Sequence, residues 1–196
     1  MSKGAQTRNQ ILDHASRLAS QVGVEGLTIG ALADGLQLSK SGLFGHFRSK
    51  EGLQVAVLEH AAESFAREVI RPALSEPRGE PRMRALFERW LAWDRDGVLP
   101  GGCIFVAAAT ELDDRPGIVR DRLVALQLEW VDVLVTTFRK GIEAGAFAPA
   151  ADPVQFAQDL YGVMLACHHH ARLLGDAAAE LRARRAFDSL LAAARA

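Results

Sequence analysis

The densest cluster of chemistry-bearing side chains in this 196-residue chain is the run Cys167-His168-His169-His170. Thiolate and imidazole groups are ligands that zinc prefers in proteins. The run lies in a predicted helix, however, where consecutive residues point about 100° apart, so at most two of these side chains share a site. No Cys-x-x-Cys or His-x-x-x-His pair supplements them. We therefore predict no metal and no cofactor, with one histidine facing an internal pocket, one at a subunit interface and one in solvent.

Sequence patterns typical of enzymes are missing. There is no Gly-rich phosphate loop, no Gly-x-Ser-x-Gly turn and no Ser/His/Asp set in a strand context. The two cysteines, Cys103 and Cys167, lie far apart and are expected to be reduced thiols. The N-terminus has no apolar signal segment, and the uncharged runs are too short to cross a membrane. We expect a cytoplasmic protein that is neither an enzyme nor bound to a membrane.

Large aromatic side chains are candidates for binding a small molecule, because ligand pockets are mostly apolar with a few polar groups. Taken alone, each aromatic residue fits the hydrophobic core better, and the acidic residues near position 111 could equally end a helix. The predicted pocket residues are Trp90, Trp93, Cys103, Phe105, Glu111, Trp130, Tyr161 and His168.

Charge is distributed unevenly along the chain. The first 50 residues carry six basic and three acidic side chains, whereas the remainder carries 17 basic and 21 acidic ones. A basic N-terminal segment on an acidic body favours an anionic partner at that segment only. Its short predicted helix, Lys40 to His46, has a small, polar outer face that can enter the DNA major groove, which is about 12 Å wide. That face comprises Ser39, Lys40, Ser41, Gly42, Gly45 and His46.

The elements that must position these side chains are helices. Alanine, leucine and arginine dominate, apolar residues recur at helical spacing, and no long alternating strand pattern occurs. Thr28, Ser39 and Ser49 are predicted N-caps of three successive helices. Asp152-Pro153-Val154-Gln155 is a further start signal, with Asp as the N-cap, Pro at the first helical position and Gln at the capping-box position. The prediction is an all-α protein of about nine helices: Gln6–Val22, a helix from Thr28 through Leu36, Lys40–His46, Ser49 to Arg71, Arg82–Arg95, Cys103–Asp113, Ile118–Ala144, Pro153 to Gly175 and Ala177–Ala194.

The segment from Thr28 to Leu53, TIGALADGLQLSKSGLFGHFRSKEGL, resembles the DNA-binding segment of TetR-family transcriptional regulators. The shared features are the leading Thr, the aromatic residue followed by His-Phe, and the Ser-Lys-Glu before a Leu. Two positions depart from the family pattern. Phe44 stands where the family usually has a phosphate-binding Tyr, and Leu36-Gln37 replaces the Ala-Gly of the turn. A less specific resemblance to one effector-domain subgroup covers Pro100-Gly101-Gly102-Cys103 through Glu111-Leu112, and Arg115-Pro116-Gly117.

The resemblance implies a helix-turn-helix domain at residues 1–48 and an effector-binding and dimerisation domain at residues 49–196. It implies a homodimer that binds a palindromic double-stranded DNA operator, most simply as a repressor, and that a small-molecule effector releases. The positions that fall where the family touches DNA or braces its recognition helix are Thr28, Lys40, Phe44, His46 and Lys50.

Three alternatives remain open for these positions. Lys50 is an ordinary solvated lysine in one interpretation, His46 braces the third helix against the first in another, and Phe44 and Phe47 favour packing over contact. An adaptor built only for dimerisation is a further functional class. We expect the last two helices to form the dimer face, because Leu160, Met164, Phe187 and Leu191 would leave apolar surface exposed on a monomer.

Overall fold

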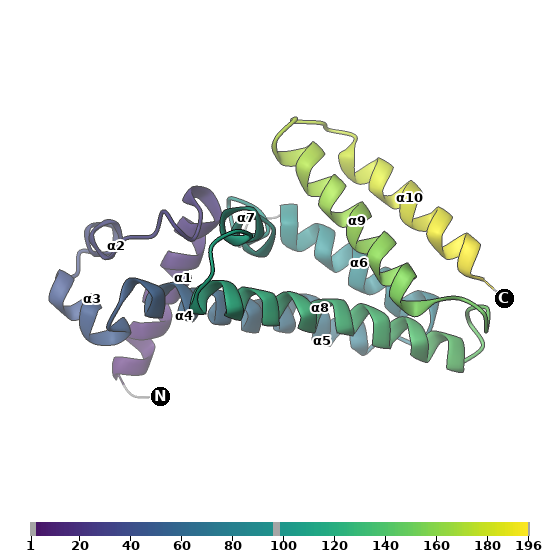
Figure 1. Cartoon of the computed structure of the whole chain (residues 1–196), viewed down its shortest axis with the longest axis horizontal. Helices are drawn as coiled ribbons and strands as arrows, with labels where there is room; N and C mark the ends of the chain where they lie inside the picture. Colours follow the sequence, from purple (N-terminus) through teal and green to yellow (C-terminus); the bar gives the residue numbers. More distant parts are fainter. Residues whose placement is uncertain (1–2, 96–98, 196) are drawn as a thin grey trace. The chain divides into compact units, whose positions relative to one another are not determined.

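The computed structural model describes residues 3–95 and 99–195. The continuous stretch from residue 50 to 74 counts as one helix, so the described residues form nine helices and no strand, which confirms the all-α prediction. The predicted bounds agree within three residues. In chain order the elements are α1 (Lys3–Val22), α2 (Ile29–Leu36), α3 (Lys40–Phe47), α4 (Lys50–Phe65), the π-helical segment Ala66–Ile70, α5 (Arg71–Leu74), α6 (Glu80–Arg95), α7 (Ile104–Leu112), α8 (Ile118–Glu143), α9 (Pro153–Arg172) and α10 (Ala179–Ala194) (Figure 1).

The chain folds as two compact units, each with its own core. Unit 1 comprises Met1–Phe65 and Asp96–Leu126, and therefore holds α1 to α4, α7 and the first part of α8. Unit 2 comprises Ala66–Arg95 and Gln127–Ala196, with α5, α6, the rest of α8, α9 and α10.

Side-chain caps start the short helices of unit 1 where they were predicted. The hydroxyl oxygen of Thr28 accepts a hydrogen bond from the Ala31 N–H at 3.1 Å, and that of Ser39 accepts one from the Gly42 N–H at 3.1 Å. Ser49 does the same for the Gly52 N–H at 2.9 Å. Each bond satisfies one backbone donor that the first turn of a helix leaves without a partner.

The turn between α2 and α3 closes without a glycine. Gln37 has φ 55° and ψ 36°, a left-handed conformation, and its N–H donates to the carbonyls of Ala33 and Asp34. A glycine adopts this conformation freely, whereas a residue with a Cβ atom does so at a cost. Gln37, which stands where the resembled pattern has Gly, is therefore a strained residue on the surface.

The core of unit 1 forms where α1 packs on α4. Ile11, Ala15 and Ala19 of α1 are buried, as are Leu53 and Val57 in α4. The two short helices add further side chains to this core, namely Leu32, Ala33, Leu43 and Phe47.

The helix that begins at Lys50 runs three residues further than predicted, and it changes pitch along its length. Its α-helical hydrogen bonding gives way to a π-helical turn over Ala66–Ile70, and α5 follows with Pro72 near its start. Proline lacks an N–H and clashes with the carbonyl four residues earlier in a regular α-helix. The carbonyl four residues before Pro72 belongs to Glu68, and Glu68 lies within the wider π-helical turn.

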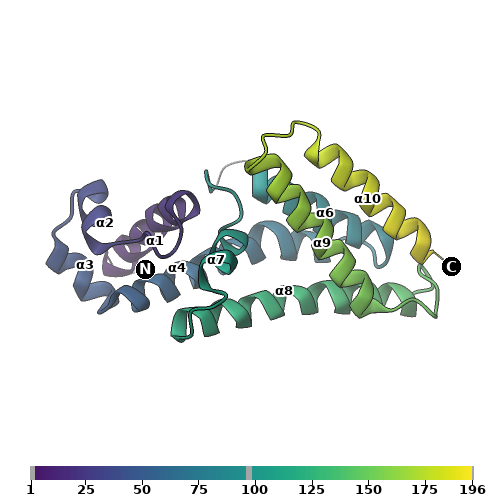
Figure 2. The same cartoon turned by 45° about the horizontal axis from the view of Figure 1, so that its top comes forward.

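Unit 2 is built around aromatic side chains. The Phe138 ring stacks on those of both Phe147 and Phe156, with centroids 4.4 and 4.0 Å away. The Phe87 ring of α6 meets the Phe187 ring of α10 at 4.3 Å. The helices α9 and α10 form an antiparallel pair, visible in both Figures 1 and 2.

The start of α9 follows its sequence signal in one respect and departs from it in another. Asp152 accepts hydrogen bonds from the N–H groups of Val154 and Gln155 at 2.8 and 3.3 Å, so it is the predicted N-cap. The Gln155 side chain does not reach back to that cap. Its amide instead donates to Asp159 at 2.8 Å, one turn along the helix.

One expectation about α9 and α10 is wrong. Leu160, Met164, Phe187 and Leu191 are at most 1% exposed in the isolated chain. They point between the two helices and toward the core of unit 2, because two helices that pack on each other bury the side chains that face the partner helix. They therefore do not leave apolar surface exposed on a monomer, and any dimer contact of this pair must use its outward side.

Candidate nucleic-acid interface and ligand pocket

The third helix holds one face on the core and presents the other to solvent. Leu43 and Phe47 are buried, which confirms Phe47 as a packing residue. The guanidinium of Arg8 in α1 lies 5.3 Å from the centre of the Phe47 ring, a cation–π contact. The exposed face comprises the predicted residues Ser39, Lys40, Ser41, Gly42, Gly45 and His46. The side chain of Phe44 lies outside the described residues.

His46 is exposed, and its ring neighbours that of Phe47 on its own helix at 6.1 Å. Arg8 of α1 contacts α3 through the ring of Phe47. His46 is therefore placed on the solvent side, and the structure favours it as a member of the polar face over a brace for the helix.

Three helix N-termini of unit 1 carry predicted DNA-binding residues. Thr28, Ser39 and Lys50 stand at the starts of α2, α3 and α4, and all three are exposed. The free N–H groups of a helix N-terminus and its positive dipole end favour an anion. Lys50 also has a partner that sequence reasoning missed, since its amine lies 3.5 Å from a carboxylate oxygen of Glu25. No sequence pattern links these residues, which are 25 positions apart.

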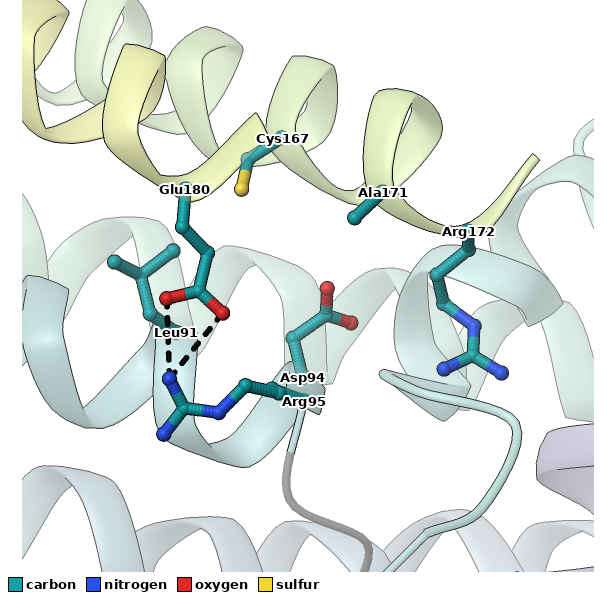
Figure 3. A pocket seen from close by; sticks show the side chains of 7 residues that line it. All are labelled: Leu91, Asp94, Arg95, Cys167, Ala171, Arg172 and Glu180. Atoms are coloured by element: carbon teal, nitrogen blue, oxygen red, sulfur yellow. Dashed lines mark hydrogen bonds and ion pairs between the residues drawn. The ribbon is translucent and has the colours of Figure 1, made fainter. Parts of the chain in front are cut away.

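Unit 2 contains a polar hollow of about 370 Å³ between α6, α9 and α10 (Figure 3). Two acidic and two basic side chains line it, together with Leu91, Ala171 and the thiol of Cys167. Arg95 donates to both carboxylate oxygens of Glu180, at 3.3 and 3.1 Å, and closes one side. Volumes from about 300 Å³ upward suit small-molecule ligands. The charged residues of the lining are Asp94, Arg95, Arg172 and Glu180.

Two buried groups shape the chemistry of this hollow. The carboxylate of Asp94 lies 2.7 Å from the Nδ1 atom of His168, and only 7% of the Asp94 side chain is exposed. Burial raises the pKa of the Cys167 thiol to about 11, and the nearby carboxylates of Asp94 and Glu180 add to this. The thiol therefore stays protonated at neutral pH.

The predicted pocket residues are distributed over both units. Cys103, Phe105 and Glu111 belong to unit 1, and the remaining five belong to unit 2. The carboxylate of Glu111 accepts the backbone N–H of Glu25 at 3.0 Å. The hollow in unit 2 is lined by other residues, and His168 reaches it only through Asp94. The other four residues of unit 2 are the buried Trp90, Trp93 and Trp130, and Tyr161, whose hydroxyl donates to Gln127 at 2.8 Å.

The histidine run separates as helical geometry requires. His168 faces Asp94, His169 is exposed, and the half-exposed ring of His170 lies 3.8 Å from Asp176. Within residues 3–95 and 99–195, no three His, Cys, Asp or Glu side chains converge as metal ligands would. In the same part of the chain, no helix has the length and apolar character that crossing a membrane requires.

Two parts of the sequence match known protein families. Residues 11–57 match the family described as bacterial regulatory proteins, tetR family, and residues 79–187 match the tetracyclin repressor-like, C-terminal domain. The chain is similar to the HTH-type transcriptional repressor NemR of Escherichia coli K12, with 24% identity over 85% of this chain and 84% of that protein.

Solved structures show the same fold. A TetR transcriptional regulator from Chloroflexus aurantiacus has a TM-score of 0.86 and 26% identity, covering 98% of this chain and 96% of that one. The protein AibR, solved in complex with isovaleryl coenzyme A and operator DNA, has a TM-score of 0.73 and 23% identity, covering 93% of this chain and 96% of that one.

Proposed function

This chain belongs to the TetR family of bacterial transcriptional regulators, and we propose that it is a repressor that binds a palindromic operator as a homodimer and is released by a small molecule. Family membership confirms the prediction of a DNA-binding regulator over an enzyme or a dimerisation adaptor. The observation that carries the proposal is the exposed polar face of α3, anchored from behind by Leu43 and Phe47.

We assign DNA recognition to residues 1–48 with Lys50 at the boundary, and effector binding and dimerisation to residues 49–196. Ser39, Lys40, Ser41, Gly42 and His46 would face base edges and phosphates of the major groove. Thr28 and Lys50 would contact phosphates at helix N-termini. Phe44 has no hydroxyl with which to bind a phosphate, so its proposed contribution is packing. Such a regulator acts in the cytoplasm, where its operator lies.

A single short helix reads only a few base pairs, so the proposal requires two copies of the DNA-binding domain at residues 1–48, here called the head. Two heads on a twofold axis would read half-sites about 34–36 Å apart, or a multiple of that distance. We keep α9 and α10 as the proposed dimer face, through their outward side. Support comes from a shallow groove between these helices, whose apolar lining residues are Val163, Ala166, Ala179, Ala183 and Ala186.

The polar hollow of unit 2 is our candidate effector site. Its two arginines and two carboxylates would favour a ligand that carries hydrogen-bonding or charged groups over a purely apolar one. AibR, which has the same fold, provides a parallel, since that protein was solved with both a small molecule and operator DNA.

A gel-shift assay with the DNA upstream of the protein's own gene tests the DNA-binding proposal. Wild type should shift this DNA, and the double variant Lys40→Ala/Lys50→Ala should not. Lys140→Ala, which removes an exposed lysine from α8 in unit 2, is the matched control and should bind as wild type does. Full binding by the double variant would refute the assignment of α3 as the recognition helix.

Equilibrium sedimentation tests the homodimer. The wild-type chain should sediment as a dimer at micromolar concentration without DNA, and a charge on the outward side of the pair, Ala166→Arg, should yield a folded monomer. A wild-type monomer, or a dimer that Ala166→Arg leaves intact, would refute this dimer face.

A further inference from the structure

The carboxylate of Glu25, in the loop between α1 and α2, lies between a lysine and an arginine from two other elements of unit 1. One of its oxygens lies 3.5 Å from the amine of Lys50, at the start of α4. The same oxygen accepts a hydrogen bond at 3.3 Å from Arg115, in the turn between α7 and α8. Two cations therefore share one acceptor.

The position of Glu25 is fixed from behind by two further side chains. The amide of Gln54, which is 2% exposed, donates to the carbonyl of Val24 at 2.9 Å and to the second oxygen of Glu25 at 3.0 Å. Glu111 of α7 accepts the backbone N–H of Glu25 at 3.0 Å. Because both its backbone and its side chain are held, Glu25 is a positioned group rather than a mobile surface carboxylate.

We propose that Glu25 and Arg115 are positioning residues that set how readily Lys50 binds a DNA phosphate. The inference rests on the proposed function, because it takes Lys50 as a phosphate contact. Glu25 competes with the phosphate for the amine of Lys50, and Arg115 weakens that competition by binding the same carboxylate. The affinity of the head for DNA therefore depends on a turn of the α7–α8 region that carries no part of the recognition helix.

The opposite charges of the two positioning residues predict opposite effects. Glu25→Gln keeps the shape and the acceptor for Gln54 but removes the charge that competes for Lys50, so DNA affinity should rise. Arg115→Gln leaves Glu25 to Lys50 alone, so affinity should fall. An exposed ion pair contributes about 0.2–1 kcal/mol, which corresponds to a change of about 1.4- to 5-fold for each head.

A double-mutant cycle separates this mechanism from a general charge effect. Fluorescence anisotropy with a labelled random-sequence duplex suffices as the probe, because phosphate contacts are independent of sequence. Glu25→Gln and Arg115→Gln are measured in the wild type and in Lys50→Ala. Both effects should disappear in the Lys50→Ala background. Asp34→Asn, which removes an exposed carboxylate from α2 of the same head, is the matched control and should act equally in both backgrounds.

The salt dependence supplies a second readout. Lys50→Ala should lower the slope of log affinity against log salt by about 0.9 for each head, because one phosphate is no longer neutralised. Glu25→Gln should leave that slope unchanged and move only the affinity. Circular dichroism and thermal melting of each variant verify that the head remains folded.

Three results would overturn the inference while leaving the proposed function intact. They are an equal effect of Glu25→Gln in both backgrounds, a loss of affinity on Glu25→Gln, and a reduced slope on Arg115→Gln that persists without Lys50. The last would make Arg115 a DNA contact itself. An unchanged affinity and slope in Lys50→Ala alone would instead refute the phosphate contact on which the inference rests.

Discussion

Replacing Gln37 by glycine should stabilise the protein, although it deletes a side chain from the helix-turn-helix turn. Gln37 has φ 55° and ψ 36°, and it is exposed, so its side chain contributes little packing. Its N–H bonds to Ala33 and Asp34 come from the backbone and survive the substitution. The change therefore acts on backbone conformation alone.

The magnitude follows from two opposing costs. A left-handed conformation costs a residue with a Cβ atom about 1–2 kcal/mol, which the glycine avoids. Glycine in turn gives the unfolded chain more freedom, at about 0.5–1 kcal/mol. The two ranges leave an expected net gain for Gln37→Gly of about 0–1.5 kcal/mol in the free energy of unfolding.

Urea unfolding followed by circular dichroism measures this free energy at one protein concentration for all variants, since a dimer's stability depends on concentration. Gln37→Ala keeps the unfavourable conformation and is the control, with an expected change within about 0.5 kcal/mol. A destabilised Gln37→Gly with an unchanged denaturant slope would show that the strain at this residue is smaller than the entropic cost of glycine, and the reasoning would fail.

Three further predictions follow from the structure. Phe187→Ala should lower the free energy of unfolding by about 3–5 kcal/mol, because it opens a cavity against Phe87. The control Leu181→Ala, on the exposed side of α10, should change this free energy by less than about 0.5 kcal/mol. Similar losses in the two variants would contradict the observed burial. The charged pair Phe187→Asp with Leu191→Arg should unfold unit 2 rather than release a folded monomer, which near-UV circular dichroism distinguishes. The pKa of Cys167 in the folded protein is raised to about 11, so the free energy of unfolding should fall as pH rises from about 9 to 11. Urea unfolding at several pH values should show a smaller fall for Cys167→Ala than for the wild type. An identical pH profile for the two proteins would contradict the raised pKa.

Local chemistry made much of the fold and of the DNA-binding face predictable from sequence. The caps at Thr28, Ser39, Ser49 and Asp152 involve partners within three residues along the chain, so composition and spacing suffice to locate the helix starts. The two sides of α3 follow from helical periodicity in the same way, with Leu43 inward and Lys40 outward.

Tertiary structure alone decided which apolar faces meet and which charges pair. Leu160, Met164, Phe187 and Leu191 have the residue types of an interface, but α9 and α10 pack on each other and on α6, and this packing buries them within the chain. The pairing of Glu25 with Lys50 and Arg115 joins residues 25 and 90 positions apart, and the hollow lined by Asp94 and Glu180 arises only where three helices converge. Burial and electrostatic pairing depend on distances in space, and periodicity along the chain determines only which side of each helix is available for them.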